Sequence, residues 1–505
     1  IMKRSFRDLI KQRCHNRLVK IICALPKFQS GPIEEIQQSY ITFSKAAHEA
    51  REKRRPPAGG QIQLTNVRLV EVFDIDHHEM LTNGLRNLFP ACKKVQEMAA
   101  QHEQSAGELS NGSWHKIGVI TNSSDLRWIF FGERQRVEAL PKYVEAIEVS
   151  LQSILPSLHV VSFDLHISES VSSELCKALD AVYEPEFYFS RWWPLGRRVG
   201  YSINFSDSCA NRAYAEIIDE LRLDAARWLS RYIRGTHFTK KYIRAGRVPA
   251  TMAFRISGNP TDPEALKAWN ENNRSWLIAS YASSINPPFE AGNVTIMLPE
   301  NWAGKCDAPN RVLIRDMAGD SKTRPNLQRV LDGLTAYQAV NEYVASIRQI
   351  VEKARMPVYS SLAQFKMQVR RRALARAYEV QHCLHLLNRV KLELIDGKDS
   401  MAFFLMSLGR FHGEKQFYGE KALPDVLQEH LSITVDIVRK HAENMENALS
   451  ETINLQNIHV MVRLGRAMKA LAIVGLVFSA LQTAVYRHEL MALAKSILDH
   501  VIRLF

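Results

Sequence analysis

The sequence predicts an α+β protein, in which a mixed α/β N-terminal domain is followed by an all-helical C-terminal region that ends in one long helix. Three observations support this class. Short runs rich in Val, Ile, Phe, Tyr and Trp alternate with helical patterns between residues 115 and 298, as is typical of helices packed on a sheet. Strand-like runs are absent from residue 326 onward. The last 81 residues contain no proline, the residue that most strongly interrupts helices.

The chain has 505 residues, which is more than the roughly 250–300 residues that one hydrophobic core supports. We therefore expect several segments. They are a basic helical N-terminal segment (1–60), a mixed α/β domain (61–325), a helical region (326–424) and a long stalk helix with an apolar tail (425–505).

The individual elements follow from hydrophobic periodicity and from turn residues. Helices are expected where apolar residues recur every three or four positions, at 3–25, 33–54, 142–154, 169–181, 211–234, 326–354, 358–394 and 397–412. Strands are expected in the runs 115–121, 126–132, 158–166, 250–256 and 292–298. Residues 186–205 are typical of a strand region with a hairpin turn near Pro194.

The charge of the chain indicates an anionic partner. The net charge is +13, and residues 1–60 alone hold thirteen Lys or Arg against five acidic residues, a net of +8. Such a concentration favours a nucleic acid, a nucleotide or an acidic lipid surface. The alternative is a basic face that is simply solvated.

The cysteines indicate a reducing compartment. There are seven, an odd number, and none forms a Cys-x-x-Cys pair. This pattern argues against a disulfide framework and against a zinc ribbon. The expected location is the cytoplasmic face of a membrane, with the cytoplasm itself as the alternative.

The membrane expectation rests on residues 470–486, a 17-residue segment without any charged side chain. It is flanked by Arg463, Arg466 and Lys469 on one side and by Arg487 on the other. At about 1.5 Å per residue the segment spans roughly 25 Å, close to the hydrocarbon thickness of about 30 Å. The alternative is a helix buried in a soluble bundle. The residues expected to contact lipid are Ala470, Leu471, Ile473, Val474, Leu476, Val477 and Phe478.

A coiled-coil seam precedes this segment. Apolar residues fall at 435, 438, 442, 445 and 449, in steps of three and four. Continued in register, the seam would reach the polar residues Thr452, Gln456 and His459, which would line a wet axis between subunits or set the register. Alternatively, it shifts to Ile453, Val460, Leu464 and Met468. Either version predicts a homo-oligomer.

The run from Asp425 through Arg466 into the apolar sequence ALAIVGLVFSAL resembles the stalk helix and first membrane helix of CorA-type divalent-metal channels. The resemblance implies a cytoplasmic α/β domain, a long helix and a pentameric membrane pore. The family's Gly-Met-Asn signature is absent, since the chain reads TAVYRHELM after the apolar segment, and a second span is missing as well. Divergent relatives in bacterial defence systems, which respond to nucleotide signals, suggest a nucleotide-gated effector.

Two groups of arginine and lysine residues are candidate anion-binding sites. Arg191, Arg197 and Arg198 accompany two tryptophans, and Lys366, Arg370, Arg371 and Arg372 share a helical face. Guanidinium groups pair with phosphate and stack on bases, so both groups suit a nucleotide or nucleic acid. The alternative is a tryptophan core and a solvated helix.

Asp74, Asp76 and His77 are candidate ligands of a divalent metal ion, because carboxylate oxygens and an imidazole nitrogen crowd residues 73–79. The alternative is a solvated helix start. Phosphate-binding-loop, dinucleotide-binding and nucleophile-elbow motifs are absent, which makes a binding protein the preferred interpretation over an enzyme.

Together these patterns predict a membrane-associated oligomeric sensor or effector, in the form of a divergent CorA-like channel gated by a nucleotide or nucleic acid. One alternative is a soluble helical-bundle protein that binds nucleic acid or protein. The other is a metal-dependent phosphoesterase.

Overall fold

The computed structural model describes residues 6–24, 32–55, 61–90, 114–122, 134–189, 201–257, 269, 289–291, 294–298, 310–315, 323–363, 367–396, 398–413, 415–419 and 421–504. The chain divides into two compact units, each made from separate stretches. The first unit comprises residues 1–347 and 387–438, and the second comprises residues 348–386 and 439–505.

The order of elements confirms the predicted class, with strands confined to the N-terminal part and helices alone following residue 323. The described strands are β1 (Gln61–Asp74), β2 (Trp114–Thr121), β3 (Gln135–Val137), β4 (Val144–Leu155), β5 (Leu158–Ile167), β6 (Glu186–Phe189), β7 (Tyr201–Asn204), β8 (Ala250–Ser257), β9 (Phe289–Ala291), β10 (Val294–Met297) and β11 (Asn310–Arg315). The described helices are α1 (Phe6–Ala24), α2 (Pro32–Arg54), η1 (Ile75–His77), α3 (His78–Leu88), α5 (Glu169–Asp180), α6 (Ser206–Leu229), α7 (Lys240–Arg244), α9 (Thr323–Ala363), α10 (Met367–Asp396), α11 (Lys398–Leu405), η3 (Met406–Leu408), α12 (Lys415–Tyr418) and α13 (Leu423–Leu504).

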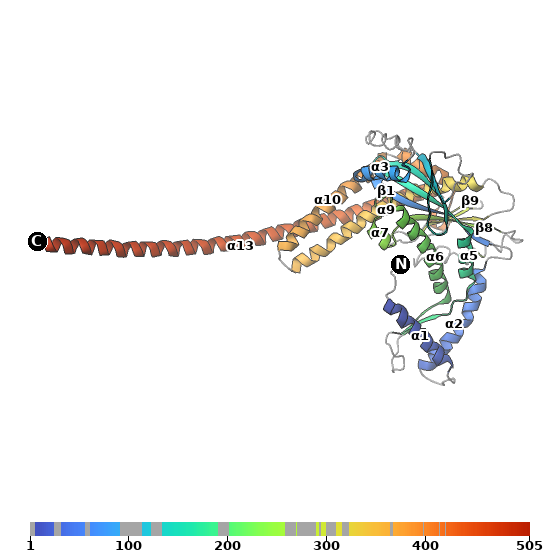
Figure 1. Cartoon of the computed structure of the whole chain (residues 1–505), viewed down its shortest axis with the longest axis horizontal. Helices are drawn as coiled ribbons and strands as arrows, with labels where there is room; N and C mark the ends of the chain where they lie inside the picture. The colour runs from blue at the N-terminus through green and yellow to red at the C-terminus, as the bar shows by residue number, and fades with distance from the viewer. Residues whose placement is uncertain are drawn as a thin grey trace. The chain divides into compact units, whose positions relative to one another are not determined.

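A mixed sheet is the centre of the first unit (Figure 1). Within the described residues it has nine strands in the order β3-β2-β4-β5-β1-β8-β11-β10-β9. The pairs β8–β11 and β2–β3 are parallel, and the other neighbours are antiparallel. The long strand β1 therefore lies inside the sheet, between β5 and β8.

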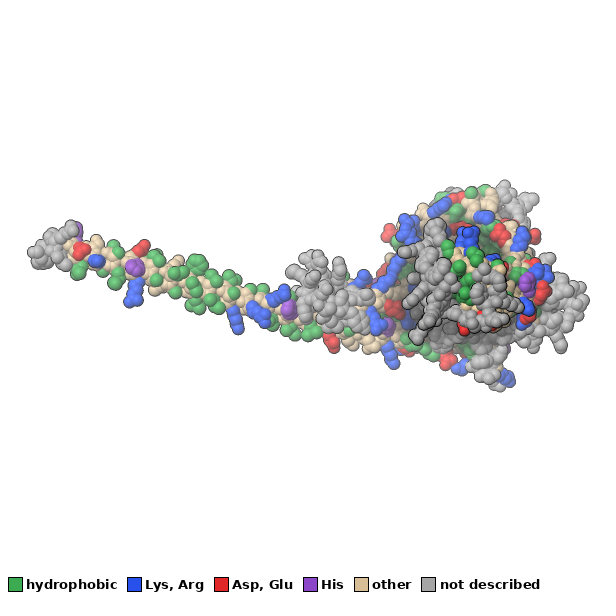
Figure 2. Space-filling view, turned by 90° about the horizontal axis from the view of Figure 1, so that it is seen from below, with side chains coloured by type: hydrophobic (Ala, Val, Ile, Leu, Met, Phe, Trp, Pro, Cys, Tyr) green, Lys and Arg blue, Asp and Glu red, His purple; other side chains and the backbone are tan. Residues whose placement is uncertain are grey.

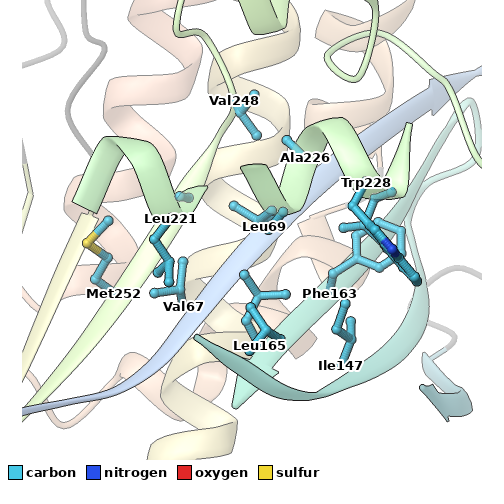
Figure 3. Packing of buried hydrophobic residues seen from close by; sticks show 14 of the residues in the cluster. Val67, Leu69, Ile147, Phe163, Leu165, Leu221, Ala226, Trp228, Val248 and Met252 are labelled. Atoms are coloured by element: carbon cyan, nitrogen blue, oxygen red, sulfur yellow. The ribbon is translucent and has the colours of Figure 1, made fainter. Parts of the chain in front are cut away.

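Strand β1 contains a bulge, and the side of the sheet that its odd-numbered residues face changes there. The register with β8 shifts between Leu64 and Asn66, so the residues that face one side change from even to odd numbers. Ile62 and Leu64 before the shift, and Val67 and Leu69 after it, all enter the same hydrophobic core. The side chains of α6 pack on this core, as the positions of Leu221 and Trp228 in Figure 3 show. Helices α5 and α6 contact each other and cover this face of the sheet.

The opposite face of β1 carries a buried ion-pair network. Arg68, which is fully buried, donates two hydrogen bonds to the Asp164 carboxylate of β5, at 2.5 and 2.6 Å. Its third nitrogen donates to Asp332 of α9 at 2.6 Å. Because these residues come from two strands and a helix, the network fixes α9 on the sheet. The first unit thus has helices on both faces of its sheet.

A small module lies beside the main core of this unit. Helices α1 and α2 pack on the hairpin β6–β7, and Val19, Ile22, Ile36, Phe187 and Phe189 form its buried centre. The predicted helices at 3–25 and 33–54, and the predicted hairpin within 186–205, correspond to these elements.

The second unit is helical, and its three segments are residues 348–363 of α9, 367–386 of α10 and 439–504 of α13. Apolar side chains from all three segments are buried. They are Val351, Ala354, Val380, Cys383, Leu384, Ala442, Met445 and Leu449.

The predicted seam on α13 is buried, but it is covered within the chain. Residues 435, 438, 442, 445 and 449 all have less than a tenth of their surface exposed. Thr452 continues this buried face, and its hydroxyl donates to the carbonyl of Ala448 at 2.8 Å. This part of the seam therefore packs inside one chain and does not provide a wet axis between subunits. Every described side chain from Val460 to His500 is exposed.

Some expected elements differ from the observed ones. Residues 142–154 were predicted to be helical, and this prediction is wrong, because they form strand β4. The apolar residues of this segment fit both a three-to-four and a two-residue period, and pairing with β2 and β5 selects the strand. The predicted strand 126–132 lies outside the described residues. Helix α9 continues to Ala363, beyond the expected end at 354.

Candidate functional site

The apolar segment 470–486 is the most distinctive candidate site, and it lies within the uninterrupted helix α13. The helix starts at Leu423 with Pro424 in its first turn, where the missing N–H of proline has no helical partner to lose. Figure 2 shows a band of apolar side chains along this helix, with Lys and Arg side chains on both sides of the band. Among the described helices, α13 alone is long and apolar enough to cross a membrane, judged by length and composition.

The predicted lipid-contacting residues all face solvent in the single chain. Leu471 is 69% exposed, Leu476 is 71% exposed and Phe478 is 65% exposed. Burying one large apolar side chain contributes about 1.5–3 kcal/mol, so a cover over the apolar residues of this segment would contribute about 10–20 kcal/mol. That amount is comparable with the whole stability of a folded protein, about 5–15 kcal/mol. The described part of the chain provides no such cover for the segment.

The predicted anion-binding side chains all lie outside the described part of the structure. Arg191, Arg197 and Arg198 lie in 190–200, outside the described residues, and so does Lys366. Arg370, Arg371 and Arg372 belong to α10, but their side chains are outside the described part. The anion-binding role of both groups stays a prediction.

Several cations of the basic segment 1–60 have structural roles instead. Arg54 is buried and donates to the carbonyl of Ala181 at 3.1 Å. Arg51 and Arg55 both bind the Asp180 carboxylate at the end of α5. Lys20 forms an ion pair with Glu184 at 2.7 Å. The basic segment therefore offers less charge to a partner than its composition suggests.

The predicted metal ligands form a cap at the end of β1. The Asp74 carboxylate accepts hydrogen bonds from the backbone N–H groups of Asp76 and His77, both at 3.1 Å, and so begins η1. Its other oxygen accepts from the Tyr343 hydroxyl of α9 at 2.9 Å. His77 Nδ1 lies 2.5 Å from the first Asp74 oxygen. Asp74 therefore joins a strand end, a helix start and α9.

The electrostatics of this cap agree with an ion pair. Burial opposes the charge on Asp74, but the hydrogen bond from His77 and the charge of its ring outweigh burial and lower the pKa of Asp74. The hydrogen bond to Asp74 raises the pKa of His77. Among the described residues, no three His, Cys, Asp or Glu side chains are arranged to hold a metal ion. The hypothesis of a divalent metal at Asp74, Asp76 and His77 therefore finds no support in this geometry.

A second basic segment was missed by the sequence reasoning. Residues 225–261 contain eight Lys or Arg and no Asp or Glu. The signal that would have found it is the absence of acids over 37 positions, which a count of net charge over the first 60 residues does not reveal. In the structure this segment covers the end of α6, a loop, the short helix α7 and strand β8.

A buried glutamate holds the loop before α7 in place. Glu71 of β1 is fully buried, and its carboxylate accepts the backbone N–H of His237 at 2.8 Å and that of Phe238. Burial raises the pKa of Glu71 to about 7, although these backbone donors act in the opposite direction. Burial also lowers the pKa of His237 to about 3, so this imidazole is neutral. The loop backbone is thus attached to the strand by an acceptor inside the core.

Comparison with known proteins adds no assignment to these sites. No protein-family model matches the chain, and no curated protein gives a significant match.

Proposed function

We propose that this protein is a membrane-associated homo-oligomer, built as a divergent CorA-like channel or effector, whose folded N-terminal part responds to a nucleotide or nucleic acid. The observation that carries the proposal is the uncharged segment 470–486, whose side chains are all exposed on α13. A lipid bilayer is the cover that matches this length and composition.

The residues that flank the segment support membrane insertion. Arg463, Arg466 and Lys469 precede it, and Arg487 follows it. Long basic side chains reach from the edge of the hydrocarbon to the headgroups, which lets a segment of roughly 25 Å match a slightly thicker bilayer. Because most of these charges precede the segment, the part of the chain before it is assigned to the cytoplasmic side.

The exposed face of α13 before the segment supports association of copies. Val460, Leu464 and Met468, which belong to the shifted version of the predicted seam, are 45%, 57% and 64% exposed. The upstream seam is already buried within the chain, so the apolar residues that remain for a neighbouring copy lie here. Helices that pair along such a face bury what a single chain exposes.

The order of elements supports the CorA-like architecture. A mixed sheet domain is followed by the long helices α9 and α10 and then by the 82-residue helix α13. Because the Gly-Met-Asn signature is absent, the proposal names no transported species. The cationic segment 225–261 of the first unit supports an anionic cue.

Liposome flotation tests the membrane part of this proposal. The full chain is expected to float with vesicles and to stay bound at high salt, because apolar insertion is insensitive to ionic strength. Val474→Lys with Val477→Lys places two charges at the centre of the segment, at about 2.5–3.5 kcal/mol each, and is expected to abolish flotation. A chain stopped at Met461 is also expected to stay in the soluble fraction.

A matched variant controls for the added charge. Asn447→Lys with Ser450→Lys adds the same charges with the same spacing at exposed positions of α13 outside the segment, and it is expected to float normally. If the unmodified chain stays with the soluble fraction, the membrane proposal is wrong. The soluble nucleic-acid- or protein-binding alternative would then be preferred.

A further inference from the structure

A basic stretch of the first unit runs from the end of α6 to the start of β8. Two backbone hydrogen bonds hold residues 236–249 of this stretch against β1. Thr236 donates its N–H to the Val72 carbonyl at 2.9 Å, and Val70 donates its N–H to the Pro249 carbonyl at 3.1 Å. Val70 and Val72 are about 7 Å apart along β1. The 14 residues from Thr236 to Pro249 therefore leave and return to the same part of the strand.

Buried groups hold both ends of this excursion, the segment 236–249, in place. Gly235 approaches β1 so closely that a Cβ atom there would lie 2.5 Å from the Val72 carbonyl oxygen, and Glu71 binds the next residues of the loop. On the returning limb, the buried Arg222 donates to the carbonyls of Gly246 and Val248 at 3.0 and 3.2 Å. The excursion is therefore a rigid support for the side chains that it carries.

Three exposed cations on this support and two on the residues just before it have no ion pair with a described acid. They are Arg231, Arg234, Lys240, Lys241 and Arg244, which we call the α7 basic surface. On α7 itself, Tyr242 and Ile243 are buried, so the three cations of this helix lie on its outer side. Two acids of adjacent segments have partners of their own, since Asp224 pairs with Arg227 and Glu138 pairs with Arg136. No ion pair between the five cations and a described acid offsets their positive charge.

We propose that the α7 basic surface binds the phosphate backbone of nucleic acid without reading the base sequence. This inference deepens the proposed function, because it names the surface that would receive a nucleic-acid cue. The cations are spread over a helix end, a loop and a second helix, which suits a polymer with regularly spaced phosphates better than one small anion.

Two observations favour phosphates over bases and over lipid. The Tyr232 ring, which could otherwise stack on a base, is covered by the Arg136 guanidinium at 4.5 Å and packs against Trp228 at 5.0 Å. Membrane-surface binding normally combines cations with inserted apolar side chains. No large hydrophobic side chain between residues 225 and 250 is exposed, and every one of these positions is described.

The test is binding of a fluorescent 20-base-pair duplex to the full chain in nonionic detergent, measured over a range of salt concentrations. If all five cations contact phosphates, the slope of log K against log salt is about −4.5. Lys240→Gln, Lys241→Gln and Arg244→Gln together are expected to make the slope shallower by about 3. Since each contact contributes about eightfold at 0.1 M salt relative to 1 M, this variant should bind at least about 100-fold more weakly there.

The matched control removes the same charge from another surface. Arg13→Gln, Arg17→Gln and Lys45→Gln change three exposed cations of α1 and α2, and they are expected to leave affinity and slope unchanged. Two duplexes of different sequence should compete equally, and circular dichroism should show the same helicity in all variants.

Four outcomes would overturn the inference, three of them seen with the duplex alone. These three are unchanged binding by the α7 variant, equal weakening by both triple variants, and strong preference for one duplex sequence. Loss of binding to anionic vesicles with unchanged duplex binding would make the surface a lipid site, which also contradicts it. Because binding is measured in micelles, failure of flotation with intact duplex binding would count against the membrane proposal alone.

Discussion

Glu71 is a buried residue whose ionisation is expected to make stability depend on pH. Its pKa is about 7 in the folded chain, above the ordinary value of 4.5, because it is buried. The folded state then binds this proton more tightly than the unfolded state, so the contribution of Glu71 to stability falls as pH rises from about 4.5 to 7 and does not fall further above that range. The difference between the folded and the ordinary pKa of Glu71 corresponds to about 3 kcal/mol in the free energy of unfolding.

The prediction is tested by unfolding the full chain in detergent with denaturant at about pH 5 and pH 8. Glu71→Gln removes the titrating group, so the stability advantage at pH 5 should shrink by about 3 kcal/mol relative to the unmodified chain. Equal pH dependence in both proteins would contradict the assignment.

The cap at Asp74 shows what a local sequence pattern can and cannot predict about a polar cluster. The cluster of acids and histidines at 73–79 is visible in the sequence, and its polar character is real. Its role depends on Tyr343, which is 269 positions away and donates to Asp74. A local motif could not show that the carboxylate was already engaged.

Among the elements, helix α13 has two different apolar faces. Leu449 is fully buried in the second unit, whereas Leu455, six residues later, is 50% exposed. Leu449→Ala is expected to destabilise the helical unit by about 2–5 kcal/mol, because it leaves a cavity in a packed interior. Denaturation followed by far-ultraviolet circular dichroism would measure this.

Leu455→Ala on the same helix is the control, with an expected change within about 0.5 kcal/mol. Equal effects at both positions would show that the intrachain seam has been placed incorrectly.

The strands β1 and β4 show why sheet elements were harder to predict than helices. The bulge near Asn66 reverses the alternation of β1, so a two-residue period is not continuous along it. Strand β4 is buried on both faces and therefore lacks a clear polar side. In both cases the partner strands decide the conformation, and they are distant in sequence.

For the whole molecule, we expect association into a homo-oligomer in nonionic detergent. Sedimentation should give a protein mass that is a multiple of the chain mass. Leu464→Lys with Met468→Lys charges the exposed face before the apolar segment and should shift the protein toward a monomer. The control Asn447→Lys with Ser450→Lys should leave the mass of the oligomer unchanged. A monodisperse monomer obtained without detergent would contradict both the oligomer and the membrane association.

The amino-acid order alone established the fold class, the long C-terminal helix and its uncharged segment, because proline content and apolar periodicity act over neighbouring residues. The position of β1 inside the sheet, the engagement of Arg51, Arg54 and Arg55 by α5, and the rigid support beneath Lys240 and Arg244 were decided by tertiary structure. These features depend on which distant groups become buried together, since a carboxylate or guanidinium removed from water requires a partner. Local sequence does not specify that partner.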